Sequence, residues 1–183
     1  PVVYHTVSAF NRTVSAKLSD CGSMLYVVNR ARGEVGVTRH AGSVSSMSVD
    51  KDGKIGTPNH RFLTRLTGPT DLAISPIAFG SVPRGSLFVV TGTPLIQTES
   101  GRITKDATGV FIGIVIIDPQ SGQAIKRIDL SPGSKNKLQG NYPLISPDAI
   151  VFDRRGNLYI GDTGIGGHLF EPRVQGKSKI WRI

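Results

Sequence analysis

Acidic side chains stand at both edges of one alternating stretch, residues 146–164, SPDAIVFDRRGNLYIGDTG. Asp148 opens its first alternating segment, and Asp162 closes the second. A carboxylate at such a place can take a proton in acid–base catalysis or help to hold a hard cation. It can equally accept hydrogen bonds from backbone amides and do no chemistry. Which of these roles a carboxylate has depends on the other polar groups that lie close to it.

Few other residues have types and spacings that suggest chemistry. The four histidines, at positions 5, 40, 60 and 168, lack metal-ligand spacing, and His168 lies in the glycine-rich segment GIGGHLF. His168 is therefore a candidate for substrate contact or an exposed loop residue. Cys21 is the single cysteine, which excludes an intrachain disulfide and a cysteine metal site, and we expect it to be inert. The sequence contains no P-loop, nucleophile elbow, His-Glu-x-x-His motif or EF-hand loop.

Alternation of apolar and polar residues dominates the chain, whereas helical periodicity is almost absent. Short runs rich in β-branched and aromatic residues, such as MLYVVNR, SLFVVTG, FIGIVIID, DAIVFD and NLYIGDT, are bounded by glycine-containing turns such as DKDGK, DPQSGQ and DRRGN. The sequence therefore predicts an all-β chain of short antiparallel strands.

The runs form three related units, and their alignment places polar residues at two recurring positions. One position, at the start of the first strand of each unit, holds Ser15, Asp71 and Asp148. The other position, at the end of the second strand, holds Asn29, Thr91 and Asp162. We therefore expect each set of three side chains to occupy equivalent places in the fold.

Four strands per unit are typical of β-propeller blades, and we expect blades at about 13–66, 68–130 and 146–183 within one domain, residues 1–183. In the last unit, SKIWRI is the expected third strand. The first residues, VVYHTVSAF, are the expected outer strand of a preceding unit. Three blades with partial ends do not close a ring, so further blades come from a longer chain or another copy. We favour a fragment of a larger ring.

Residues 146–163 resemble the repeat of NHL-type six-bladed propellers and are similar to the senescence marker protein/gluconolactonase family. The likeness lies in a proline before an acidic residue, an aliphatic strand ending in Asp, a Gly-Asn turn and a Leu-Tyr-Ile-x-Asp strand. It is looser over residues 68–91 and weak over 13–30. YIGDTGIGGHL has a weaker similarity to yellow/royal jelly propellers, which bind small molecules. These resemblances imply a six-bladed β-propeller.

The gluconolactonase resemblance also implies a divalent cation, calcium or zinc, held by Asp148, Asp71 and Ser15. It makes Asp148 the base in hydrolysis of a lactone or similar ester, while the cation polarises the carbonyl or activates a water. Asp162, His168 and Asn29 are the expected contacts of a small-molecule substrate. The chain departs from the family pattern because Ala149 replaces a glycine and the first-blade glutamate has no match.

The alternative function is a non-catalytic propeller that binds a protein, small molecule, glycan or polyanion through its loops and basic surface. The net charge is +9, and long insertions occur at residues 92–109, 131–145 and 164–179. Ten basic residues fall in residues 126–183, and they are Lys126, Arg127, Lys135, Lys137, Arg154, Arg155, Arg173, Lys177, Lys179 and Arg182. A solvated basic surface without a partner is the favoured explanation of these residues over a nucleic-acid site.

Hydropathy and composition bear on the compartment of the protein. The longest apolar run, VFIGIVII at residues 110–117, is too short to span a membrane and suits a buried strand. Asn11-Arg12-Thr13 is a glycosylation sequon, whereas a single cysteine fits a reducing compartment. The compartment stays open, and we favour a secreted or periplasmic location.

Overall fold

Antiparallel strands form every regular element in the described part of this computed structural model, which contains no helix there. The described residues are 13–30, 42–92, 95–97, 103–105, 111–131, 134–136, 144, 147–162 and 179–183. The predictions for VVYHTVSAF, His168, Lys137, Arg173 and Lys177 therefore lie outside them. The prediction of an all-β chain is confirmed.

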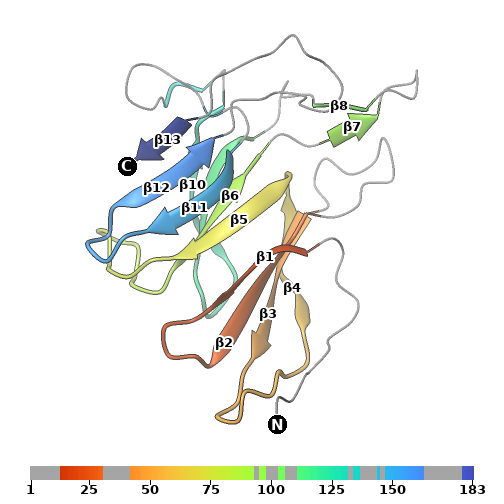
Figure 1. The fold of residues 1–183 in the computed structure, drawn as a ribbon, viewed down its shortest axis with the longest axis vertical. Coiled ribbons are helices and arrows are strands. Elements are labelled where there is room, and N and C mark those ends of the chain that lie inside the picture. Colours follow the sequence, from red (N-terminus) through yellow and green to blue (C-terminus); the bar gives the residue numbers. More distant parts are fainter. Residues whose placement is uncertain are drawn as a thin grey trace.

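The strands form three main sheets that follow one another along the chain (Figure 1). The first has the order β1-β2-β3-β4 and contains β1 (Thr13–Leu18), β2 (Met24–Asn29), β3 (Gly42–Ser48) and β4 (Asn59–Leu66). The second has the order β10-β9-β6-β5 and contains β5 (Pro69–Ile74), β6 (Leu87–Thr91), β9 (Gly113–Ile117) and β10 (Ala124–Asp129). The third has the order β11-β12-β13 and contains β11 (Pro147–Phe152), β12 (Leu158–Asp162) and β13 (Lys179–Arg182).

A small hairpin forms a separate two-stranded sheet in the connection between β6 and β9, which pair directly with each other. It pairs β7 (Leu95–Gln97) with β8 (Ile103–Lys105). The four strands predicted for the second unit are all present, and SKIWRI supplies the third strand of the third sheet.

The hydrophobic core consists of two clusters between neighbouring sheets. Residues of the first and second sheets make one cluster: Tyr26, Val28, Val44, Phe62, Leu66, Leu72, Leu87, Val89, Val115 and Ile117. The second and third sheets, with their flanking segments, make the other: Ala73, Val82, Phe88, Val90, Ile112, Ile114, Ile116, Leu130, Leu144, Ile150, Leu158 and Ile160. Because the second sheet is covered on both faces, β6 and β9 are buried at every position. This explains their continuous apolar sequences.

The first strand of each sheet lies beside the first strand of the next, with β5 between β1 and β11 (Figure 1). These three inner strands run in the same direction. Near their starts, the Asp71 carboxylate contacts both Ser15 and Ile150. At their other ends, a cavity of about 320 Å³ is lined by residues of all three, including Leu18, Ile74 and Phe152. We call these two ends of the sheets the start end and the turn end.

Aspartates at the turn end stabilise the tight turns that the sequence predicted. Asp153 accepts hydrogen bonds from the backbone N–H groups of Arg155 (2.8 Å) and Asn157 (2.9 Å). The Asn157 side-chain amide (2.7 Å) is the main reason why the pKa of Asp153 lies below its usual value. Asp118 likewise accepts bonds from Gln120 and Ser121. These carboxylates are therefore turn caps, as aspartates commonly are in tight turns.

Candidate functional site

Every inner strand has a β-bulge close to its start, which changes the predicted alignment. The bulges lie between Thr13 and Ser15, between Pro69 and Asp71, and between Pro147 and Ala149. Equivalent places on the ladders after the bulge therefore hold Ser15, Asp71 and Ala149. The bulged residues themselves are Val14, Thr70 and Asp148. The predicted equivalence of Asp148 with Asp71 and Ser15 is thus wrong by one residue.

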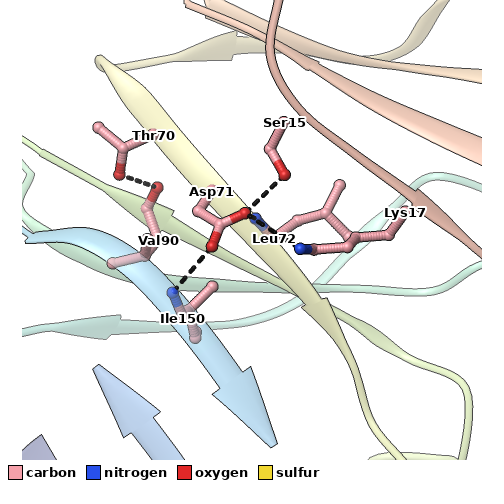
Figure 2. Close-up of polar contacts among 7 residues, drawn as sticks. All are labelled: Ser15, Lys17, Thr70, Asp71, Leu72, Val90 and Ile150. Carbon is pink, nitrogen blue, oxygen red and sulfur yellow. Dashed lines mark hydrogen bonds and ion pairs between the residues drawn. The ribbon is translucent and has the colours of Figure 1, made fainter. Parts of the chain in front are cut away.

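The carboxylate of Asp71 joins the three inner strands (Figure 2). Its Oδ1 accepts hydrogen bonds from the Ser15 hydroxyl (2.6 Å) and from the N–H of Leu72 (2.8 Å). Its Oδ2 accepts the N–H of Ile150 at 3.0 Å. The Lys17 ammonium lies 3.9 Å from Oδ1, and the Asp71 side chain is 16% exposed. Sequence reasoning found Ser15 and Asp71 but could not find the backbone donor of Ile150.

Thr70 makes a second link between the second and third sheets, which sequence reasoning missed. Its hydroxyl donates to the carbonyl of Pro147 at 2.7 Å, and Thr70 is buried. The sequence feature that could have indicated this link is the proline before each bulge. Pro69 and Pro147 occupy the same register position, so aligning them places Thr70 at the bulge.

The groups around Asp71 show whether a divalent cation could bind there. All the partners of its carboxylate given above are hydrogen-bond donors. Two N–H groups and a hydroxyl use its oxygens, and an ammonium lies beside them. A cation would have to displace these donors and would meet the positive charge of Lys17. Ala149, the third residue at this register position, has no ligand atom in its side chain. The residues around Asp71 therefore do not fit a metal ion.

The other predicted ligand, Asp148, is exposed at its bulge in β11, one register position away from Asp71. Within the described ranges, no three His, Cys, Asp or Glu side chains are grouped so that they could hold a metal ion. The structure thus brings Ser15 and Asp71 together, whereas Asp148 belongs to a different register position.

The second recurring position, held by Asn29, Thr91 and Asp162, is confirmed as equivalent by the pairing of these residues with Thr13, Pro69 and Pro147. All three side chains are buried. The Asn29 amide donates to the hydroxyls of Ser43 (3.3 Å) and Ser45 (3.0 Å), while the Thr91 hydroxyl accepts the N–H of Gly113 (3.2 Å). Asn29 therefore bonds within its own sheet, and substrate contact by Asn29 and Asp162 stays a prediction.

Cys21 has a more reactive environment than its sequence suggested. It is exposed at the turn end, beside a cavity of about 580 Å³ that Tyr26, Arg84 and Pro119 also line. Hydrogen bonds with the hydroxyls of Ser19 (3.4 Å) and Ser23 (3.0 Å) lower the pKa of the Cys21 thiol to about 7. The expectation that Cys21 is inert is therefore not supported.

We predict that the rate of Cys21 alkylation by iodoacetamide rises with pH and that the midpoint of this rise lies near pH 7. The thiolate is the nucleophile, so a lowered pKa moves the rise to lower pH. Replacing both Ser19 and Ser23 by alanine should raise the midpoint by more than about one pH unit. Protein unfolded in urea is the control, with a midpoint near the free-cysteine value of about 8.5. A midpoint above pH 8 in the folded protein would contradict the prediction.

Comparison with models of known protein families found no match, and a search of curated proteins found no relative of this chain. No helix in the part of the chain that the structure describes is long and apolar enough to cross a membrane. The propeller expectation therefore rests on the sequence motifs and on the sheet geometry described above, whereas the hydrolase expectation rests on the sequence motifs alone.

Proposed function

We propose that the three sheets are consecutive blades of a β-propeller. The register of the sheets supports a continuing series. The third strands of the three sheets have equivalent residues at one position: Val44, Ile114 and Ile180. They are equivalent because they pair with Val28, Val90 and Gly161, which hold the same place in the second strands. Val44 and Ile114 are 0% and 1% exposed, whereas Ile180 is 80% exposed. A further sheet stacked on the third would bury Ile180, as expected for a six-bladed ring.

The function we propose is binding of an anionic ligand at the start end of these blades. The single observation that carries it is the position of the long connections. The four long connections that leave the described strands at this end follow β2, β6, β10 and β12, and they comprise residues 30–41, 92–112, 130–146 and 163–178. β2, β6 and β12 end at the start end because they are antiparallel to the inner strands. Long loops gathered on one face of a repetitive scaffold often carry binding.

Charge in these four connections favours an anionic ligand. Their basic residues are Arg30, Arg32, Arg39, Arg102, Lys105, Lys135, Lys137, Arg173 and Lys177. Their acidic residues are fewer: Glu34, Glu99, Asp106 and Glu171. At the turn end, Lys51, Lys54, Arg154 and Arg155 are offset by the turn aspartates Asp50, Asp52, Asp118 and Asp153. These four connections therefore carry nine basic and four acidic residues, an excess of positive charge that would attract a polyanion.

Heparin binding tests the proposal with two matched double variants. Replacing Lys135 and Lys137 by alanine should weaken affinity for heparin about tenfold at low salt, because two cationic contacts are lost. Replacing Arg154 and Arg155 by alanine removes the same charge from the turn end and should have little effect. Affinity would be measured by calorimetry over a series of salt concentrations. An equal loss in both variants, or a loss in neither, would contradict binding at the start end.

Hydrolysis of a lactone, with Asp148 as base, is the second candidate function. It is favoured by the exposure of Asp148 at a β-bulge, a feature that is frequent beside active sites. The assay measures lactone hydrolysis by the unmodified protein and by Asp148→Ala. If this candidate is right, the rate falls about a hundredfold or more on Asp148→Ala. A rate that does not change on this substitution removes the candidate.

A further inference from the structure

We infer that Asp71 is a metal-independent strut that holds three sheets together, at the place where the resemblance implies a metal site. The strut consists of the Asp71 carboxylate, the Ser15 hydroxyl and the N–H groups of Leu72 and Ile150. This inference does not depend on whether the start end binds anions.

The unpaired edges of the inner strands explain why a carboxylate is useful here. β1, β5 and β11 each pair with a neighbour in their own sheet on one side only. Backbone N–H groups on the other side need acceptors from elsewhere. Asp71 Oδ2 accepts one of these, the N–H of Ile150 in β11, at 3.0 Å. The second sheet thereby satisfies a backbone donor of the third.

The same carboxylate reaches the first sheet through its other oxygen. Asp71 Oδ1 accepts the Ser15 hydroxyl at 2.6 Å, a distance typical of a short, charge-assisted bond. Lys17, 3.9 Å from this oxygen, adds a weaker contact because its side chain is 46% exposed. A single ionised side chain therefore contacts all three sheets.

The residues at this register position fit a strut better than a ring of metal ligands. Ser15 supplies a donor, Asp71 supplies the acceptor, and Ala149 supplies no polar side-chain atom. In the third sheet, the backbone N–H of Ile150 takes the place of a side-chain partner. A ligand ring would instead place oxygen atoms on each strand.

Thermal unfolding of the 183-residue chain tests the strut. Asp71→Ala should lower the midpoint by about 5 °C or more, because the buried donors lose their acceptor. Asp71→Asn should cost less, since the amide oxygen can still accept one bond. Asp52→Asn is the matched control, because it makes the same change at an exposed position in the turn between β3 and β4, and it should shift the midpoint by less than about 1 °C.

Metal titration of the unmodified protein keeps the inference testable if the Asp71 variants do not fold. EDTA, calcium and zinc should each leave its midpoint unchanged.

Hydrogen exchange gives a local readout in Ser15→Ala and Asp71→Asn, where the Ile150 amide should exchange faster only after the Asp71 change. The Leu158 amide, which donates to Ile183 at 3.0 Å in the same sheet, should stay protected. A midpoint raised by calcium or zinc, or lowered by EDTA, in the unmodified protein would overturn the inference, as would equal effects of Asp71→Asn and Asp52→Asn.

Discussion

Replacing Gly122 by alanine is expected to destabilise the protein by about 3 kcal/mol or more. Gly122 lies in the turn between β9 and β10 and has a φ of 73°, in the left-handed region that favours glycine. A Cβ atom at this position would collide with the carbonyl of Phe62 in β4 of the first sheet. Neither the Phe62 carbonyl nor the backbone of residue 122 can move away without separating the first and second sheets. Urea unfolding followed by circular dichroism measures the loss.

Gly53→Ala is the control that separates the collision from the backbone strain. Gly53 also lies in a turn with a positive φ, 80°, but a Cβ there would meet nothing within 4 Å. Its replacement should cost only about 1 kcal/mol, the price of the left-handed conformation alone. Equal costs for the two variants would show that the β9–β10 turn does not pack closely against the first sheet. The Tyr26 hydroxyl, which donates to the Pro119 carbonyl at 3.1 Å, supports this packing.

The sequence predicted the strands and their grouping well, because each strand has its own local pattern. The apolar run at 110–117 and the alternating segment at 158–162 became β9 and β12. The equivalence of Asn29, Thr91 and Asp162 was also predicted, because no bulge interrupts the strands that end there. Patterns within one strand were therefore sufficient for these features.

The relative register of the inner strands could not be predicted in the same way. Alignment placed Asp71 on Asp148 because both are acidic, but backbone hydrogen bonds set the register and align Pro69 with Pro147. A bulge adds one residue without disturbing the apolar pattern that follows it. The partners of Asp71 were missed for a related reason, since a backbone donor such as Ile150 N–H has no sequence signature. The lowered pKa of Cys21 likewise depends on how one turn places two hydroxyls.

Leu72→Ala should destabilise the protein by about 3 kcal/mol, since Leu72 is fully buried between the first and second sheets. The substitution leaves the backbone N–H that donates to Asp71, so it removes packing while retaining the strut. Leu18→Ala is the matched control, because Leu18 is also on an inner strand but is 51% exposed, and it should cost less than about 1 kcal/mol.

Combining Leu72→Ala with Asp71→Asn shows whether packing and the strut stabilise the same contact between sheets. Adjacent residues that share one interface commonly couple by about 0.5 kcal/mol or more. If both hold the second sheet against the first, the double variant should lose less stability than the sum of the single losses, because either change already loosens the interface. Urea unfolding of the four proteins gives this coupling. Strict additivity would mean that the strut acts mainly on the third sheet, through Ile150. If Leu72→Ala costs no more stability than Leu18→Ala, the core described here is contradicted.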